Sequence, residues 1–188
     1  WRYNDDGTPK SWKVGTLTYS FGGLAFIFTV LLIGDMIWAF RERSVSTVAR
    51  LVFQKHGASD FVNGILIAAI PSAIGLGLVP IISFHSDRFR SRFGRRIPYL
   101  FVTTPVVVAG MLGLAYSDKV GQWLQLETLG IQNSTLMLLG LFWTLFEFGV
   151  IAANAVFTAL INDVVPREVM GRFYGLFRMV SLAVGIVF

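Results

Sequence analysis

The chain has 188 residues, of which 54% are hydrophobic and 14% are charged, and its mean hydropathy is +0.65. Soluble domains carry about 25% charged residues, so this composition excludes an ordinary water-soluble enzyme. The net charge is +5 and there is no cysteine, which excludes disulfides and thiolate metal sites. His56 and His85 lie 29 residues apart and make a poor metal pair, so no metal site or cofactor is indicated.

Long apolar segments predict an all-α membrane protein. A spanning helix needs about 20 apolar residues, and continuous apolar runs without period-two alternation favour helices over strands. The predicted helices cover about residues 20–55, 61–84, 98–116, 135–162 and 172–188. Because the chain begins at Trp1 and the last apolar run reaches Phe188 without a cap or polar flank, we expect a fragment with a fifth helix cut short and more helices to follow.

The first predicted helix contains an ambiguity, because residues 41–55 are charged. They could be an external amphipathic piece or the second half of an unusually long helix. Counted at 100° per residue, Asp35, Glu42, Arg43 and Arg50 share one face. A lipid-facing stripe of such charges would cost on the order of 10 kcal/mol, so the stripe must face water or protein. This favours a long, kinked first helix that ends in a turn at residues 57–60.

The distribution of basic residues predicts the orientation in the membrane, because cytoplasmic loops carry an excess of lysine and arginine. The side that holds the N-terminus would carry ten of them: Arg2, Lys10, Lys13, Arg88, Arg90, Arg92, Arg95, Arg96, Arg167 and Arg172. The other side would carry Lys55 and Lys119, with three arginines more if residues 41–50 are external. The N-terminus is therefore expected in the cytoplasm, and the positive charge does not require a nucleic-acid partner.

The most specific motif is the loop at residues 86–99, between the second and third predicted helices. On charge alone it is a membrane anchor, since arginines are attracted to an anionic leaflet. The order of residues from Asp87 to Pro98, Asp-Arg-x-x-Ser-Arg-x-Gly-Arg-Arg-x-Pro, resembles the cytoplasmic signature of the major facilitator superfamily. This longer form is similar to that of the glycoside-pentoside-hexuronide:cation symporters and the related sucrose transporters. The segment from Asp163 to Arg172 is similar to the superfamily's second cytoplasmic loop.

The resemblance implies that the chain is the incomplete N-terminal transmembrane half, with the first five helices of a twelve-helix major facilitator fold. It also implies a conformational gate, a network of loop residues that holds one conformation and breaks in another. The gate residues would be Asp87, Arg88, Gly94, Arg95, Arg96, Asp163 and Arg172. A partly wet charge pair contributes at most about 1 kcal/mol, which suits a contact that must open.

Ionisable residues inside membrane helices are functional candidates by default. The candidate substrate-binding residues are Asp35, Glu42, Arg43, Glu147, Asn154 and Arg178. Glu147 and Asn154 are seven residues apart and therefore share a helix face. A structural alternative is that Glu147 pairs with Arg178, and Asp35 with Arg43, simply to join helices.

The family resemblance adds roles to three of these residues. Gly34-Asp35 resembles a first-helix stretch whose aspartate binds sugar hydroxyls, and Arg178 falls where the family has a fifth-helix arginine beside the sugar. The stretch from Asn154 to Leu160 resembles a fourth-helix segment that begins with an aspartate shared by cation and sugar. The asparagine here favours a proton over sodium as the coupling ion, since hard cations such as sodium prefer carboxylate oxygens. Proton coupling would use Asp35, Glu42 or Glu147.

These observations predict a secondary active transporter in the cell membrane that moves a sugar or similar polar solute by alternating access, coupled to protons. No nucleophile with an adjacent base was found, so an enzyme is not expected. The expected partners are the solute, the coupling proton and the lipid bilayer. An uncoupled facilitator and a non-transporting membrane scaffold of the same fold are the alternatives.

Overall fold

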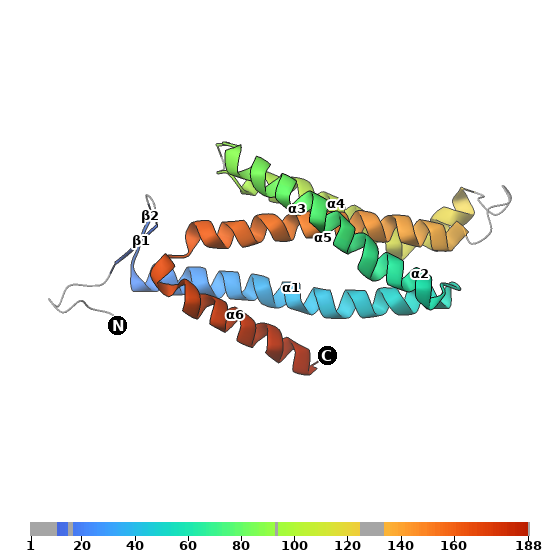
Figure 1. The fold of residues 1–188 in the computed structure, drawn as a ribbon, viewed down its shortest axis with the longest axis horizontal. Coiled ribbons are helices and arrows are strands. Elements are labelled where there is room, and N and C mark those ends of the chain that lie inside the picture. The colour runs from blue at the N-terminus through green and yellow to red at the C-terminus, as the bar shows by residue number, and fades with distance from the viewer. Residues whose placement is uncertain (1–10, 15–16, 93, 125–133, 188) are drawn as a thin grey trace. The chain divides into compact units, whose positions relative to one another are not determined.

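The computed structural model describes residues 11–14, 17–92, 94–124 and 134–187, and Figure 1 shows their fold. Within these ranges five helical segments are long and apolar enough to cross a membrane. They are α1 (Phe21–Lys55), the run Asp60–Arg88, α4 (Ile97–Trp123), α5 (Ser134–Val164) and α6 (Arg167–Val187). The run Asp60–Arg88 consists of α2 (Asp60–Gly64), the π-helix η1 (Ile65–Ala69) and α3 (Ile70–Arg88). The chain is thus an all-α, multi-pass membrane protein in its coarse architecture.

A short β-hairpin, which is not among the predicted elements, precedes the first helix. Strand β1 (Trp12–Val14) pairs antiparallel with β2 (Leu17–Tyr19), with Trp12 opposite Tyr19. Trp12 is 2% exposed, and its ring centroid lies 6.5 Å from that of Phe21 at the start of α1. The hairpin therefore packs its tryptophan against the helix that follows it.

Helix α1 is continuous over 35 residues, so residues 41–55 form its second part. At about 1.5 Å per residue it is about 52 Å long, which exceeds the hydrocarbon thickness of about 30 Å. The helix ends in a turn at Gly57, whose φ of +85° is a left-handed conformation that glycine adopts without a steric penalty. The Ser59 side chain then accepts a hydrogen bond from the Val62 backbone N–H at 3.3 Å, which caps the start of α2.

Three helix boundaries differ from the predicted ones by a turn or more, and the first is the end of the run Asp60–Arg88, which lies beyond the predicted end at residue 84. Helix α4 continues to Trp123 rather than ending near residue 116, because its polar residues are accommodated within the helix. Ser117 is buried, and its hydroxyl donates to the Leu114 carbonyl at 3.1 Å. Helix α6 begins at Arg167 rather than near residue 172, directly after Pro166, which cannot donate a backbone hydrogen bond. Residues 125–133, between the third and fourth predicted helices, lie outside the described residues.

The chain divides into two compact units. We call residues 1–47 and 160–188 the terminal unit, and residues 48–159 the central unit. In the terminal unit, α1 and α6 pack through Phe173, which is fully buried and whose ring centroid lies 4.6 Å from that of Phe28. In the central unit, Phe53 and Trp143 form a buried edge-to-face aromatic pair with ring centroids 5.9 Å apart.

Helices α4 and α5 of the central unit approach each other closely at glycines. A Cβ at Gly110 would lie 2.7 Å from the Phe146 Cα, and one at Gly149 would lie 2.9 Å from Val107 Cγ2. Such distances leave no room for a methyl group. Small residues allow membrane helices to gain van der Waals contact in the absence of a hydrophobic driving force. The Gly110 and Gly149 contacts therefore fix the spacing of these two helices.

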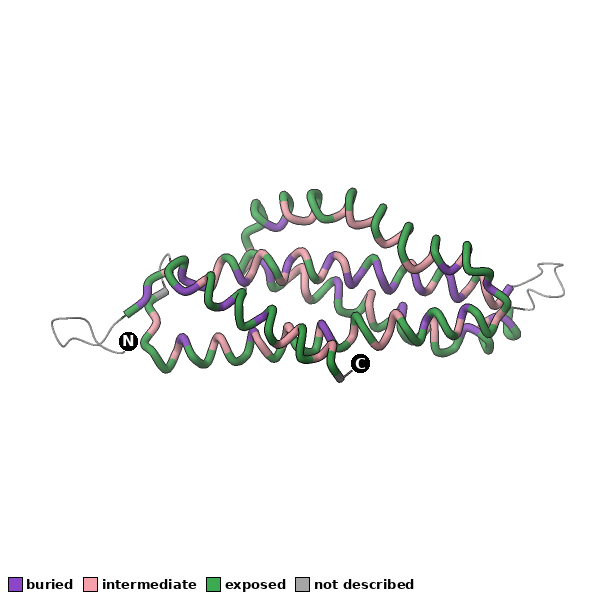
Figure 2. Tube along the Cα trace, turned by 60° about the horizontal axis from the view of Figure 1, so that its bottom comes forward, coloured by how far each residue is buried: buried purple, intermediate pink, exposed green. Residues whose placement is uncertain are grey.

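The outer faces of the helices expose apolar side chains. Figure 2 shows exposed residues along all the helices, with buried residues interspersed among them. The exposed residues include large apolar side chains such as Phe26, Leu76 and Phe101, each at least 70% accessible. Apolar surface on this scale suits a hydrocarbon surrounding and is uncommon on soluble monomers.

Candidate functional site

The loop between α3 and α4 holds a charged cluster around a buried arginine. Arg96 is 6% exposed. Its guanidinium donates to Asp87 Oδ1 at 2.6 Å and also to the hydroxyl of the fully buried Ser86. Charge-assisted hydrogen bonds of this kind are stronger than neutral ones. The loop turns at Gly94, whose φ is +97°, and the Ser91 hydroxyl donates to the Gly94 carbonyl at 2.7 Å. The motif identified in the sequence is therefore a folded turn built around one arginine.

The other predicted gate residues take different positions. The Arg88 guanidinium lies 4.0 Å from the centroid of the Phe84 ring, one helical turn earlier, and Arg95 is exposed in the loop. Asp163 is half-buried near the end of α5, and Arg172 is exposed on α6. Asp163 and Arg172 belong to the terminal unit, whereas the loop belongs to the central unit. The structure brings Asp87 and Arg96 together, and a network that includes the remaining residues stays a prediction.

Four of the predicted substrate-binding residues lie in the terminal unit. Asp35 is half-buried on α1, while Glu42 and Arg43 on α1 and Arg178 on α6 are exposed. Arg43 reaches α6, since a Cβ at Gly185 would lie 2.9 Å from its guanidinium carbon. In the described part of the chain no ion pair joins Asp35 to Arg43, so the structure gives the suggested pairing of these two residues no support.

The other two predicted residues lie on α5 in the central unit. Glu147 is buried with 8% exposure, and Asn154 is exposed. Glu147 follows Trp143 by one helical turn on a 31-residue apolar helix. A carboxylate in such a position is expensive to keep charged and is often functional. The six predicted residues are thus divided between the two units, and their convergence on one site stays a prediction.

A tryptophan contact that the sequence did not reveal holds the π-helix in place. In η1 the Ile70 N–H donates to the Ile65 carbonyl, five residues earlier. The next bond in this register would need an N–H from Pro71, which has none. The Leu66 carbonyl instead accepts a hydrogen bond from the Trp143 indole nitrogen at 2.9 Å. Trp143 is 1% exposed, so the indole supplies inside the protein the donor that proline removes. π-Helical turns of this kind often occur at functional sites.

A second missed residue is Asn63, which precedes the π-helix on α2. It is 5% exposed, and neither its amide oxygen nor its amide nitrogen has a hydrogen-bond partner in the described part of the chain. Leaving a buried polar group unsatisfied costs about 1–3 kcal/mol. The sequence signals Asn63 only as one of few polar residues in an apolar segment.

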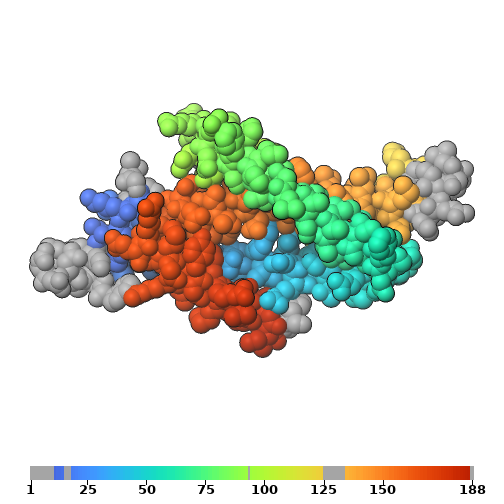
Figure 3. All heavy atoms as spheres, in the orientation of Figure 1, coloured from blue at the N-terminus to red at the C-terminus, as the bar shows by residue number. Residues whose placement is uncertain are grey.

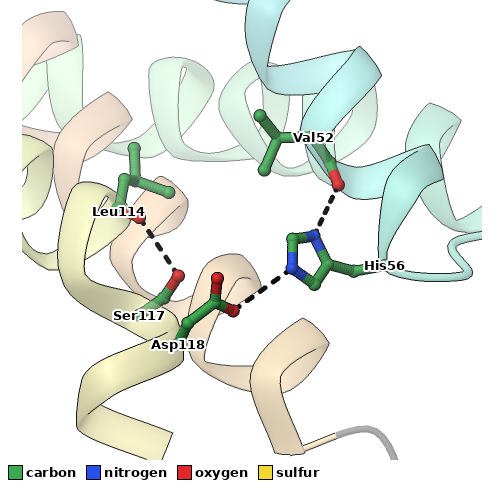
Figure 4. Close-up of polar contacts among 5 residues, drawn as sticks. All are labelled: Val52, His56, Leu114, Ser117 and Asp118. Carbon is green, nitrogen blue, oxygen red and sulfur yellow. Dashed lines mark hydrogen bonds and ion pairs between the residues drawn. The ribbon is translucent and has the colours of Figure 1, made fainter.

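A histidine–aspartate pair links the ends of α1 and α4 (Figure 4). His56 Nδ1 lies 2.8 Å from the Val52 carbonyl oxygen, and His56 Nε2 lies 3.2 Å from Asp118 Oδ1. The Asp118 side chain is 60% exposed, so water screens the pair. An exposed pair of this kind contributes about 0–1 kcal/mol, and we assign it a modest structural role.

The central unit also contains an apolar groove of about 670 Å³ between the run Asp60–Arg88 and the first half of α5. Figure 3 shows the side chains of these two segments against each other. The lining residues are Val62, Leu66, Ile70, Ser134, Leu136, Met137, Leu138, Gly140, Leu141 and Thr144. The predicted substrate-binding residues are absent from this described lining, which is suited to hydrocarbon rather than to a polar solute.

No family model matches the chain. No solved structure matches it either. The function of this chain is therefore inferred from its own residues and contacts.

Proposed function

We propose that this chain belongs to a secondary transporter of the major facilitator type that moves a sugar or similar polar solute by alternating access. The observation that carries the proposal is Glu147, a carboxylate buried in an apolar helix long enough to span a membrane. A carboxylate inside a membrane helix destabilises the folded protein, and such a residue commonly marks a solute or proton pathway. Protonation neutralises a buried carboxylate and lowers the cost of its movement between environments, which suits proton coupling.

The loop between α3 and α4 supports the same proposal. Its Asp87–Arg96 contact ties the end of one membrane helix to the start of the next. A contact that is partly exposed on the Asp87 side can break at modest cost when the helices reorient. In the proposed topology this loop and the N-terminus face the cytoplasm, and the protein lies in the cell membrane.

Uptake into proteoliposomes tests the proposal. The full-length protein is reconstituted and given radiolabelled sucrose or maltose, with and without an inward proton gradient. A proton symporter accumulates the sugar only with the gradient, and the Asp35→Asn and Arg178→Ala variants lose this accumulation. Asp60→Asn serves as the matched control, because Asp60 is an exposed acid at the start of α2.

Two other outcomes identify the alternative functions. Equilibration of sugar without accumulation identifies an uncoupled facilitator. Absence of uptake for every solute tested, with correctly folded protein, identifies a non-transporting scaffold and refutes the proposal.

A further inference from the structure

Asn63 combines burial with an unused capacity for hydrogen bonding. Its backbone is satisfied, because its N–H donates to the Ser59 carbonyl at 2.9 Å. Its side chain is not satisfied, since both amide atoms are buried and without a partner in the described ranges. Leucine would occupy a similar volume without this penalty. An asparagine at this position is therefore unfavourable for stability alone.

The backbone that carries Asn63 is held in a defined place. The Ser59 cap fixes the start of α2, and the indole of Trp143 fixes the π-helix immediately after it. Rigid support of this kind is what a binding side chain needs, because its geometry must be set before the ligand arrives. The apolar groove is lined by the neighbouring Val62 and by Leu66, but Asn63 does not belong to its described lining. The amide is thus separate from the apolar groove.

We propose that Asn63 is a binding residue for a hydroxyl-bearing solute. A primary amide presents an acceptor oxygen next to a donor nitrogen, and a hydroxyl group is both donor and acceptor. One amide can therefore bind one or two hydroxyls of an uncharged polyol without leaving a charge buried. This inference rests on the proposed transport function, since the solute reaches Asn63 only when the helices open.

Cysteine accessibility provides a direct test, because these 188 residues contain no cysteine, and labelling of the unmodified full-length protein gives the background to subtract. Asn63→Cys is prepared in the full-length protein and treated in proteoliposomes with a charged, membrane-impermeant methanethiosulfonate. Leu139→Cys is the matched control, since Leu139 is an apolar residue of the same unit with 1% exposure. We expect the cysteine at 63 to be modified faster than the one at 139, and saturating sucrose or maltose to slow its modification. Equal rates at the two positions, or no protection by either sugar, would overturn the proposal.

The variant Asn63→Leu gives an independent readout that does not require labelling. We expect its melting temperature to rise, because the unpartnered amide is removed, and its affinity for the protecting sugar to fall about tenfold, the value of one hydrogen bond. A lower melting temperature with unchanged affinity would overturn the proposal. Protection without uptake would refute the transport function alone, whereas uptake without protection would refute the role of Asn63 alone.

Discussion

Replacement of Gly110 by alanine tests the close packing of α4 on α5. The new Cβ would lie 2.7 Å from both the Cα and the backbone nitrogen of Phe146. Because these are backbone atoms, rotation of a side chain cannot relieve the overlap, and the helices must separate. Gly75→Ala is the matched control, since a Cβ there meets no atom within 4 Å.

The two variants share the gain in helix propensity, about 1 kcal/mol for alanine over glycine, so this contribution cancels in the comparison. Overpacking of a close contact costs about 1–3 kcal/mol. We therefore expect Gly110→Ala to be less stable than Gly75→Ala by about 1–3 kcal/mol. Gly113→Ala should be destabilised as well, because its Cβ would overlap Phe142 Cγ, which moves only if the whole phenylalanine side chain changes rotamer.

The assay is the unfolding free energy of each purified variant in the same detergent. Equal unfolding free energies for Gly110→Ala and Gly75→Ala would refute the described approach of α4 and α5.

Two further predictions concern buried polar contacts. Arg96→Ala should lower the unfolding free energy by about 1 kcal/mol, because the partly exposed Asp87 side chain loses its charged partner, whereas Arg90→Ala should change it little since Arg90 is exposed. Trp143→Phe should leave the Leu66 carbonyl without its indole donor, which would cost about 1–3 kcal/mol. Amide hydrogen exchange in η1 should then become faster. Unchanged exchange would show that the indole does not hold this segment.

The number and approximate positions of the membrane helices were predictable, because they depend on local composition. Each apolar run is long enough to span a membrane by itself, and the polar loops between runs set rough limits. The end of α4 was missed because Ser117 and Gly121 look like loop residues in sequence. In the structure Ser117 satisfies its hydroxyl on the preceding turn, and both residues are buried.

The candidate site was less predictable, because its features depend on contacts distant in sequence. The π-helix depends on Trp143, which lies 77 positions from Leu66. Arg88 and Arg96 look equivalent in the sequence, because each is an arginine in the same basic segment. Only the packing shows that Arg88 is exposed and lies over the Phe84 ring, whereas Arg96 is buried and binds Asp87. Pro71 has no backbone N–H, so its presence in the sequence indicates that a carbonyl in the preceding turn lacks its usual donor. The sequence does not indicate which side chain donates to that carbonyl instead.

The most direct test of the central claim, that a buried carboxylate couples solute movement to protons, is sugar accumulation by the Glu147→Gln variant. Glutamine keeps the size of the side chain but cannot take up or release the proton. The variant should lose gradient-driven accumulation of sucrose or maltose while still exchanging sugar at equal concentrations across the membrane. Glu168→Gln, at an exposed position in the first turn of α6, should accumulate sugar like the unmodified protein. Undiminished accumulation by Glu147→Gln would contradict the account.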